Sequence, residues 1–249
     1  MEEGRRLMQH AMTDVVILCG GLGNRLRPVV QDRPKPMALI NGRPFLDLVV
    51  DHVLSYGLRR IVFCTGHHGD WIAQHVSRRT DCEAIISQEQ TPLGTAGALR
   101  ACGSLLTTPT ILVLNGDSLC RIDLHAFLTA HHNRQAVATM AVIPSNGRTD
   151  AGGVTMDACG RIRTFQEKQS GSFLNAGIYA VQRHLIDDIP DSAPCSLERD
   201  IFPQLTDGRL YGYACTVPLY DIGTPARLAA FEALEKDSTK HHYITSLSQ

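Results

Sequence analysis

Short apolar runs alternate with longer amphipathic segments over the first 150 residues of the chain. Apolar runs of this length predict buried strands, and they lie at residues 15–19, 61–64, 84–87, 111–114 and 137–143. Between them, apolar positions recur at helical spacing in residues 44–56, 70–76, 95–102 and 123–131. Strand–helix–strand repetition predicts an α/β fold with a Rossmann-like open sheet, mostly parallel and flanked by helices.

The pattern changes after residue 150. Shorter apolar stretches predict strands at residues 152–154, 162–165, 175–181 and 211–217, with helices at 196–205 and 225–236. We expect this part to add a smaller β wall against which a ligand lies. Because no repeat or low-complexity linker interrupts the chain, we expect a single domain over residues 13–237 between tails at 1–12 and 238–249.

The charge balance argues against nucleic acid or an acidic membrane as a partner. The chain has 24 Lys and Arg against 25 Asp and Glu, a formal net charge of −1, so any affinity for phosphate must come from a local site. No apolar run approaches the ~18 residues that a membrane span needs. The eight cysteines form no CxxC pair and several lie in apolar runs, which is typical of reduced thiols in a cytoplasmic protein.

A glycine-rich turn, Gly20-Gly21-Leu22-Gly23-Asn24-Arg25, follows the first predicted strand. In an open parallel sheet, ligands bind beyond the carboxyl ends of the strands. Glycines there let backbone N–H groups approach phosphate oxygens, and an arginine can pair with the same oxygens. The turn could also serve the fold alone.

Two better-known phosphate loops do not match this turn. A dinucleotide loop needs a third glycine where Leu26 stands and an acid after the second strand, which instead ends Cys64-Thr65-Gly66. A nicotinamide-dependent oxidoreductase is therefore disfavoured. The chain also contains no Walker A sequence.

Three further positions carry charge at the expected ligand edge of the sheet. The prolines on either side of Lys35 predict a stiff, extended stretch that presents a fixed cation, although a solvated loop lysine is the plain alternative. Asp117 ends an apolar strand and is a natural Mg²⁺ ligand, although it could also be a turn aspartate that follows Gly116. Asp221 precedes a helix start at Thr224-Pro225 and could be a second metal carboxylate, although it could equally be a loop acid.

Two segments of the second half suggest a sugar site. Phe165-Gln166-Glu167-Lys168 places an acid and a base side by side. Asn175-Ala176-Gly177 begins an apolar strand, so that Asn175 could hydrogen-bond a hydroxyl and Gly177 could leave room for a ring.

Taken together and in this order, the motifs resemble those of the sugar-1-phosphate nucleotidyltransferase family, the sugar nucleotide pyrophosphorylases. The matching pieces are GGLGNRLRP, RPKPM, PLGTAGAL, LNGD, FQEK, NAGIY and DIGTP, between about residues 14 and 232. The resemblance implies a Mg²⁺-dependent transfer of a nucleoside monophosphate from an NTP to a sugar 1-phosphate, with release of pyrophosphate. Within the family, PLGTAGAL and residues 196–200 most resemble the guanylyltransferases of D-glycero-α-D-manno-heptose 1-phosphate. Mannose-1-phosphate guanylyltransferases, uridylyl- or cytidylyltransferases and a non-catalytic nucleotide-sensing subunit remain alternatives.

The resemblance also implies roles for individual residues. Those implied to hold the nucleotide are Leu18, Gly20, Gly21, Gly23, Gln88, Glu89, Gly94 and Thr95. Those implied to hold the sugar phosphate are Gly153, Glu167, Lys168, Asn175 and Gly177. The reacting groups would be held by Arg25, Lys35, Lys168 and a Mg²⁺ ion bound to Asp117 and Asp221. We expect small-molecule substrates as the partners, and a homo-oligomer is compatible with the sequence.

Overall fold

A central sheet of nine strands forms the core of the computed structural model, which describes residues 13–21, 26, 30, 32–148, 152–166, 171–191 and 194–246. Its middle is parallel: β1 (Asp14–Leu18) lies between β4 (Arg60–Thr65) and β6 (Thr110–Asn115), and β5 (Glu83–Gln88) extends the sheet beyond β4. The carboxyl ends of these four strands meet at one edge, where ligands bind in open α/β sheets.

The second half of the chain completes the sheet on the other side of β6. There β11 (Phe173–Gln182) pairs antiparallel with β6, and also with β8 (Ala138–Pro144) and β9 (Gly153–Met156). At the outer edges, β10 (Ile162–Gln166) pairs with β9, and β12 (Leu210–Ala214) runs parallel to β8. The strand order β10-β9-β11-β6-β1-β4-β5 with a parallel centre confirms the predicted fold class.

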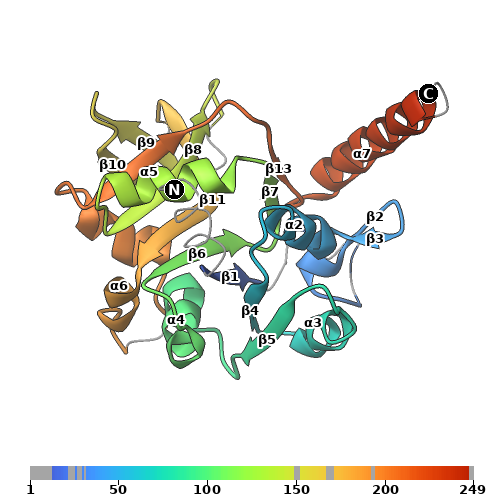
Figure 1. Cartoon of the computed structure of the whole chain (residues 1–249), viewed down its shortest axis with the longest axis horizontal. Helices are drawn as coiled ribbons and strands as arrows, with labels where there is room; N and C mark the ends of the chain where they lie inside the picture. Colours follow the sequence, from blue (N-terminus) through green and yellow to red (C-terminus); the bar gives the residue numbers. More distant parts are fainter. Residues whose placement is uncertain are drawn as a thin grey trace, which may run out of the picture.

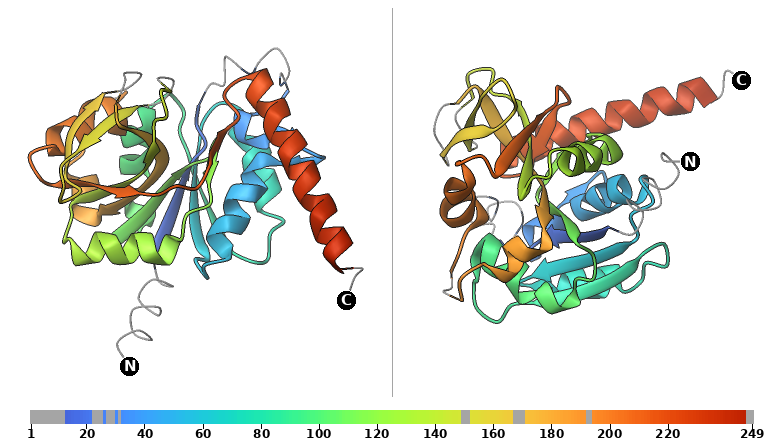
Figure 2. Two further views of the ribbon diagram at one scale, coloured as in Figure 1. Left: turned by 90° about the horizontal axis from the view of Figure 1, so that it is seen from above. Right: turned by 60° about the vertical axis from the view of Figure 1, so that its left-hand side comes forward.

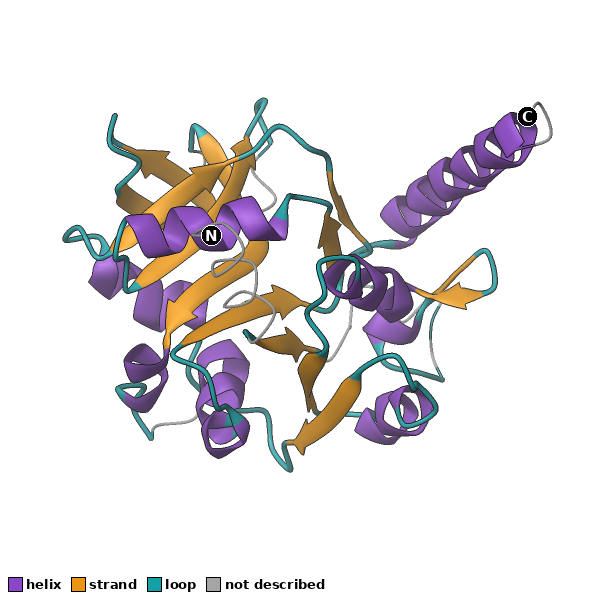
Figure 3. Cartoon of the chain, in the orientation of Figure 1, coloured by secondary structure: helices purple, strands orange, loops and turns teal. Residues whose placement is uncertain are grey.

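Helices cover both faces of the sheet (Figures 2 and 3). One face packs against helices α2 (Phe45–Leu54), α3 (Gly69–Val76), α5 (Leu124–Asn133) and α7 (Pro225–Ser246). The other packs against α4 (Gly94–Ala101), α6 (Arg183–Asp187) and two irregular turns, η3 (Leu197–Ile201) and η4 (Phe202–Leu205).

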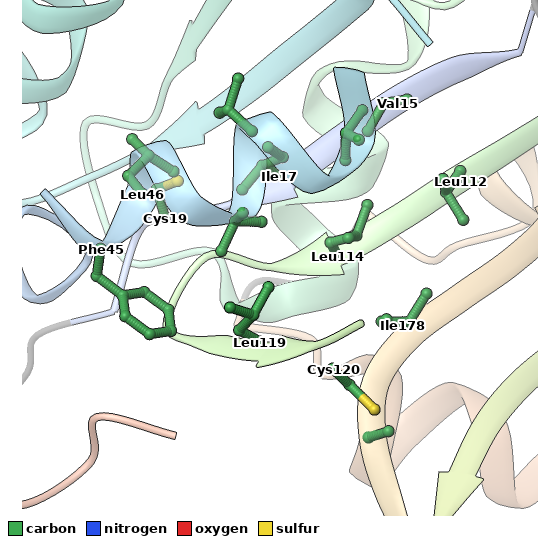
Figure 4. Close-up of a cluster of buried hydrophobic side chains, with 14 of the residues drawn as sticks. Val15, Ile17, Cys19, Phe45, Leu46, Leu112, Leu114, Leu119, Cys120 and Ile178 are labelled. Atoms are coloured by element: carbon green, nitrogen blue, oxygen red, sulfur yellow. The ribbon is translucent and has the colours of Figure 1, made fainter. Parts of the chain in front are cut away.

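The alternation of side chains along β1 explains the two cores. Val15 and Ile17 belong to one buried cluster and Val16 to the other, because successive strand residues point to opposite faces. Figure 4 shows the first cluster, in which Leu114 of β6 lies beside Ile17 and Leu112 lies nearer to Val15. Each fully buried side chain of this kind stabilises the fold by about 1.5–3 kcal/mol.

Several short elements were not predicted. They are the 3-10 turn η2 (Gly103–Leu105), the hairpin of β2 (Leu39–Ile40) with β3 (Arg43–Pro44), and the pair of β7 (Ser118–Cys120) with β13 (Leu219–Asp221). Two or three residues are too few to show a periodic pattern.

Three predicted helices or strands differ from the structure in type, or by three or more residues at one end. The segment 196–205, predicted as an α-helix, forms a π-helical turn followed by a 3-10 turn, because Pro203 has no N–H to continue an α-helical ladder. The last helix reaches Ser246 rather than residue 236, since no glycine or proline follows Pro225. The strand predicted at 211–217 ends at Ala214.

The last helix, α7, extends away from the sheet (Figure 1). Its first turns still contact the body of the protein, since Phe231 packs edge-on against Phe45 of α2. Among the described residues, no helix is long and apolar enough to cross a bilayer.

Candidate active site

A cleft with two adjoining chambers opens at the carboxyl ends of the parallel strands. The glycine-side chamber, of about 290 Å³, lies between the turn after β1 and the start of α4. The β11-side chamber, of about 430 Å³, lies between β11, β13 and η3. The two share four lining residues, Gly94, Thr95, Asn115 and Asp117. A ligand of two joined parts could therefore occupy both chambers.

The glycine-side chamber contains most of the residues expected to hold a nucleotide. Its lining includes Leu18, Gly20, Gly21, Glu89, Gly94 and Thr95. A Cβ atom on Gly20 would lie 2.9 Å from Oε1 of Glu89, so a larger residue there would displace this carboxylate from its position beside the turn. Gln88 is exposed at the end of β5 and does not line either chamber.

Glu89 is a half-buried acid in this chamber. Its Oε2 accepts a hydrogen bond from the N–H of Leu93 at 3.1 Å. Partial burial raises the pKa of its carboxyl group, and the Leu93 N–H acts in the opposite direction. The carboxylate retains further lone pairs for a ligand with N–H groups.

Gly94 is required by the close approach of another chain segment. Its φ of +76° is in the left-handed region, and a Cβ there would lie 2.3 Å from the carbonyl oxygen of Cys195. That same carbonyl accepts hydrogen bonds from the N–H groups of Ala96 at 3.0 Å and Gly97 at 3.2 Å. The start of α4 is thereby fixed against the segment before η3.

The β11-side chamber places Asn175 and Gly177 together, as expected for a sugar site. A register shift in β11 falls between Asn175 and Tyr179 and includes Gly177, whose φ is +74°. A Cβ on Gly177 would lie 2.8 Å from Oγ of Ser118. Gly153 is the first residue of β9 and does not line the chamber, whereas its neighbour Gly152 does.

The two expected metal carboxylates face this same chamber. Asp117 follows β6, and Asp221 ends β13. Pairing of β7 with β13 sets Asp221 opposite Ser118, and the N–H of Ile222 donates to the carbonyl of Asp117 at 3.2 Å. Strand pairing therefore brings together two acids that are 104 positions apart in the sequence (221 minus 117).

Each of these aspartates is paired with a cation. Nζ of Lys35 lies 2.7 Å from Oδ2 of Asp117. Nη1 of Arg227 lies 2.9 and 2.7 Å from the two carboxylate oxygens of Asp221. Within the described part of the chain, no group of three or more His, Cys, Asp or Glu side chains could hold a metal. Two carboxylates beside room for phosphate oxygens are the donor set that suits Mg²⁺.

The prediction of an extended stretch at residues 33–37 was wrong. Residues Lys35–Met37 form a 3-10 turn, η1, because the N–H of Met37 donates to the carbonyl of Pro34 at 2.8 Å. Pro36 is tolerated because the early N–H groups of a helical turn need no partner within it. Lys35 begins this turn, and its side chain is 12% exposed.

Four of the predicted site residues lie outside the described part of the chain. They are Gly23, Arg25, Glu167 and Lys168. Conversely, several residues of the β11-side chamber were given no role in the site by the sequence, namely Asn115, Ser118, Glu198, Arg199 and Arg227. Asn115 is next to Gly116 and Asp117 in the sequence, so the motif around Asp117 could have indicated it. The pattern of apolar positions does not indicate a site role for Glu198 or Arg227.

Fold and cleft together define a class of α/β proteins that bind a nucleotide-sized ligand beyond the ends of parallel strands. Within that class, residues 14–238 match the model of the nucleotidyl transferase family. The chain belongs to this family.

Curated relatives of similar sequence are guanylyltransferases. Mannose-1-phosphate guanylyltransferase of Mycobacterium tuberculosis is 33% identical over 223 residues, which cover 85% of this chain and 61% of the relative. D-glycero-α-D-manno-heptose 1-phosphate guanylyltransferase of Aneurinibacillus thermoaerophilus is 31% identical over 216 residues, covering 85% of this chain and 94% of the relative. The chain thus spans about three fifths of the mannose enzyme and nearly all of the heptose enzyme.

Solved structures with the same fold include HddC from Yersinia pseudotuberculosis complexed with GMP-PN. It superimposes with a TM-score of 0.79 at 29% identity, covering 90% of this chain and 99% of HddC. A protein from Bacillus anthracis described as a glucose-1-phosphate thymidylyltransferase has a TM-score of 0.80 at 19% identity, covering 90% of this chain and 96% of that protein. At that identity, the second likeness concerns the fold alone.

Proposed function

We propose that this chain transfers guanosine monophosphate from GTP to a sugar 1-phosphate and releases pyrophosphate, with D-glycero-α-D-manno-heptose 1-phosphate as the favoured acceptor. Family membership and the guanylyltransferase relatives support the reaction class. The near-complete coverage of the heptose enzyme favours this acceptor. The similarity to HddC, which was solved with GMP-PN, supports a guanine nucleotide as the donor. The higher identity to the M. tuberculosis enzyme favours mannose 1-phosphate as the second candidate.

The observation that carries the choice of GTP is Glu89 in the glycine-side chamber. An ionised carboxylate only accepts hydrogen bonds, and it can accept two in parallel. Guanine presents two adjacent donors, N1–H and the N2 amino group, on its pairing edge. The other bases place an acceptor beside each donor there. A half-buried carboxylate in a base pocket therefore selects guanine.

The two substrates bring roughly six negative charges to one cleft, and these charges repel at close range. The chain's main task is to offset this repulsion and to align the sugar phosphate oxygen with the α-phosphorus of GTP. Lys35, whose ammonium already lies against Asp117, supplies one fixed cation. We propose Arg25 and Lys168 as two more, on the basis of their motifs.

Enzymes of this family typically use a divalent metal ion. We propose that Asp117 and Asp221 hold Mg²⁺, which when bound supplies positive charge to the phosphate oxygens. The attacking phosphate is already ionised near neutral pH, so the reaction needs neither a protein nucleophile nor a general base. Because GTP is a cytosolic metabolite, we also propose that the enzyme works in the cytoplasm.

The test is a matrix of four NTPs against heptose and mannose 1-phosphates, scored by pyrophosphate release for the wild type and Glu89→Gln. We expect the wild type to prefer GTP. Since a charge-assisted hydrogen bond is lost, Glu89→Gln should lower kcat/KM for GTP about 10- to 100-fold. The ratio of kcat/KM for GTP to that for UTP should therefore be smaller than in the wild type. The matched control is Glu83→Gln, which changes an exposed glutamate at the start of β5, the strand that ends just before Glu89. Equal use of all four NTPs by the wild type would refute the proposal.

A further inference from the structure

A chain of hydrogen bonds joins the two chambers through one carboxylate, that of Glu198. Its Oε2 accepts from the hydroxyl of Thr95 at 2.6 Å and from the hydroxyl of Ser196 at 2.9 Å. Thr95 is at the start of α4 and lines both chambers. One end of this series of hydrogen bonds therefore lies where the nucleotide is proposed to bind.

The other oxygen of Glu198 faces the sugar side. Its Oε1 accepts from the phenol of Tyr179 at 3.1 Å, and that phenol accepts from Nδ2 of Asn175 at 2.7 Å. Oδ1 of Asn175 in turn accepts from the N–H of Gly177 at 2.9 Å. Thr95 and Asn175, one in each proposed half of the site, are thus linked by two intervening side chains.

The positions of these groups leave little freedom for independent movement. Tyr179 is fully buried, and the loss of solvent raises the pKa of its phenol well above the ordinary value, so the phenol stays protonated and acts as a donor. Thr95 is fixed from a second direction, because its hydroxyl accepts from the N–H of Leu197 at 2.8 Å. In this series of hydrogen bonds, the neighbours of each group determine whether it donates or accepts.

We propose that Glu198 is a positioning residue that couples the nucleotide half of the cleft to the sugar half. This inference rests on the proposed function. Because these groups cannot move independently, a nucleotide that contacts Thr95 also sets, through the carboxylate of Glu198, the positions of Tyr179 and Asn175 that receive the sugar. Such coupling is reciprocal. If the nucleotide raises the affinity for the sugar phosphate by a given factor, the sugar phosphate raises the affinity for the nucleotide by the same factor.

An isosteric amide cannot replace this carboxylate. Glu198 receives hydroxyl donors at both oxygens, whereas glutamine offers an acceptor at one end and donors at the other. Glu198→Gln therefore keeps the size of the side chain but loses one branch of the link. Tyr179→Phe removes the sugar branch alone.

The test is the affinity for mannose 1-phosphate or the heptose 1-phosphate, measured by calorimetry with and without a GTP analogue that has a methylene between its α- and β-phosphorus. In the wild type we expect the analogue to raise the affinity for the sugar phosphate about tenfold. Glu198→Gln and Tyr179→Phe should reduce this factor to about one. Thr95→Ser, which keeps the hydroxyl, should retain it.

The ratio of affinities separates positioning from a merely structural role. A variant that only loosens the fold weakens each ligand alone and leaves the ratio unchanged, and that result would overturn the inference. If Glu198→Gln does not fold, Tyr179→Phe decides the question. A wild type that binds both ligands without coupling overturns this inference but leaves the proposed function standing, whereas a wild type that binds neither overturns both.

Discussion

The acidic side chains of the cleft have different partners, and the partners indicate different tasks. Asp117 and Asp221 are each paired with a cation, Lys35 or Arg227, so they already occupy positions where positive charge is favourable. Glu89 accepts instead from a backbone N–H group. A carboxylate whose partner is an uncharged N–H group suits the recognition of a base. Carboxylates that are already paired with cations suit the binding of a metal ion beside phosphate groups.

Asp117→Asn should lower turnover by at least about 100-fold, because an amide replaces one of the two proposed metal carboxylates. The fold should survive, since the Asp117 side chain is 41% exposed. The measurement is steady-state pyrophosphate release, with circular dichroism to check folding. Asp188→Asn, at an exposed position after α6, is the control. Turnover near that of the wild type would remove Asp117 from the metal site.

A buried histidine outside the cleft should make stability depend on pH. His131 is fully buried, and Nδ1 lies 2.9 Å from the hydroxyl of Thr139, while Nε2 lies 3.0 Å from the amide nitrogen of Gln182. Burial, with a smaller contribution from the neighbouring His132, lowers the pKa of His131 from 6.5 to about 4. The unfolded chain therefore binds the proton more readily, and stability is lost as pH falls from about 6.5 towards 4.

His131→Gln should reduce the change in the free energy of unfolding between about pH 6.5 and pH 4 by up to about 3 kcal/mol. Urea unfolding at several pH values between 4 and 8 measures the difference. His184→Gln, at an exposed histidine of α6, should leave the pH dependence as in the wild type. Parallel curves for the wild type and His131→Gln would contradict the assignment.

At the scale of elements, the start of α4 is where the two chambers meet, and its geometry depends on backbone contacts. The carbonyl of Cys195 accepts from two N–H groups of the first turn of α4, and the N–H of Cys195 donates to Leu93 at 2.8 Å. The segment before η3 therefore partly satisfies the open N–H groups of α4. This contact joins residues about 100 positions apart, so neither segment alone indicates it.

Gly94→Ala should disrupt this junction. The added methyl group would meet the Cys195 carbonyl at 2.3 Å in a backbone conformation that already disfavours side chains. We expect a loss of about 2–4 kcal/mol in unfolding free energy and weaker GTP binding. The matched control is Gly103→Ala, whose methyl group would meet its nearest neighbour at 3.8 Å. Equal stability of the two variants would contradict the proposed packing.

Prediction from sequence succeeded for elements with a strong local pattern. The runs that form β1, β4 and β6 are buried on both faces, and helices α2 and α5 have clear apolar stripes. It failed for β7 and β13, whose pairing is decided by strands brought together from distant parts of the chain. These short strands carry Asp221 beside Asp117, so the site depended on an element that the sequence pattern did not indicate.

At the scale of the whole molecule, the cleft gathers residues from widely separated stretches of the chain. Motif order was enough to nominate Glu89, Gly94, Asp117, Asn175 and Asp221 for the cleft, and all five line it. Glu198 and Tyr179 could not be assigned in this way, since a hydrogen-bond chain exists only once β11 and η3 are packed together. Local motifs predict which residues meet the ligand better than they predict how those residues are held.

Because the cleft is lined by residues from both halves of the chain, a ligand that fills it should stabilise the entire fold. GTP with Mg²⁺ at about 100 times its Kd should stabilise the protein by about 2.7 kcal/mol. For a chain of this length, that corresponds to a rise in Tm of about 5–10 °C.

Scanning calorimetry should show this rise for GTP and a much smaller one for ATP at the same concentration, since adenine offers Glu89 a single donor beside an acceptor. The difference between the two nucleotides should shrink in Glu89→Gln and persist in Glu83→Gln. If ATP and GTP raise Tm equally in the wild type, the glycine-side chamber does not read the base through Glu89.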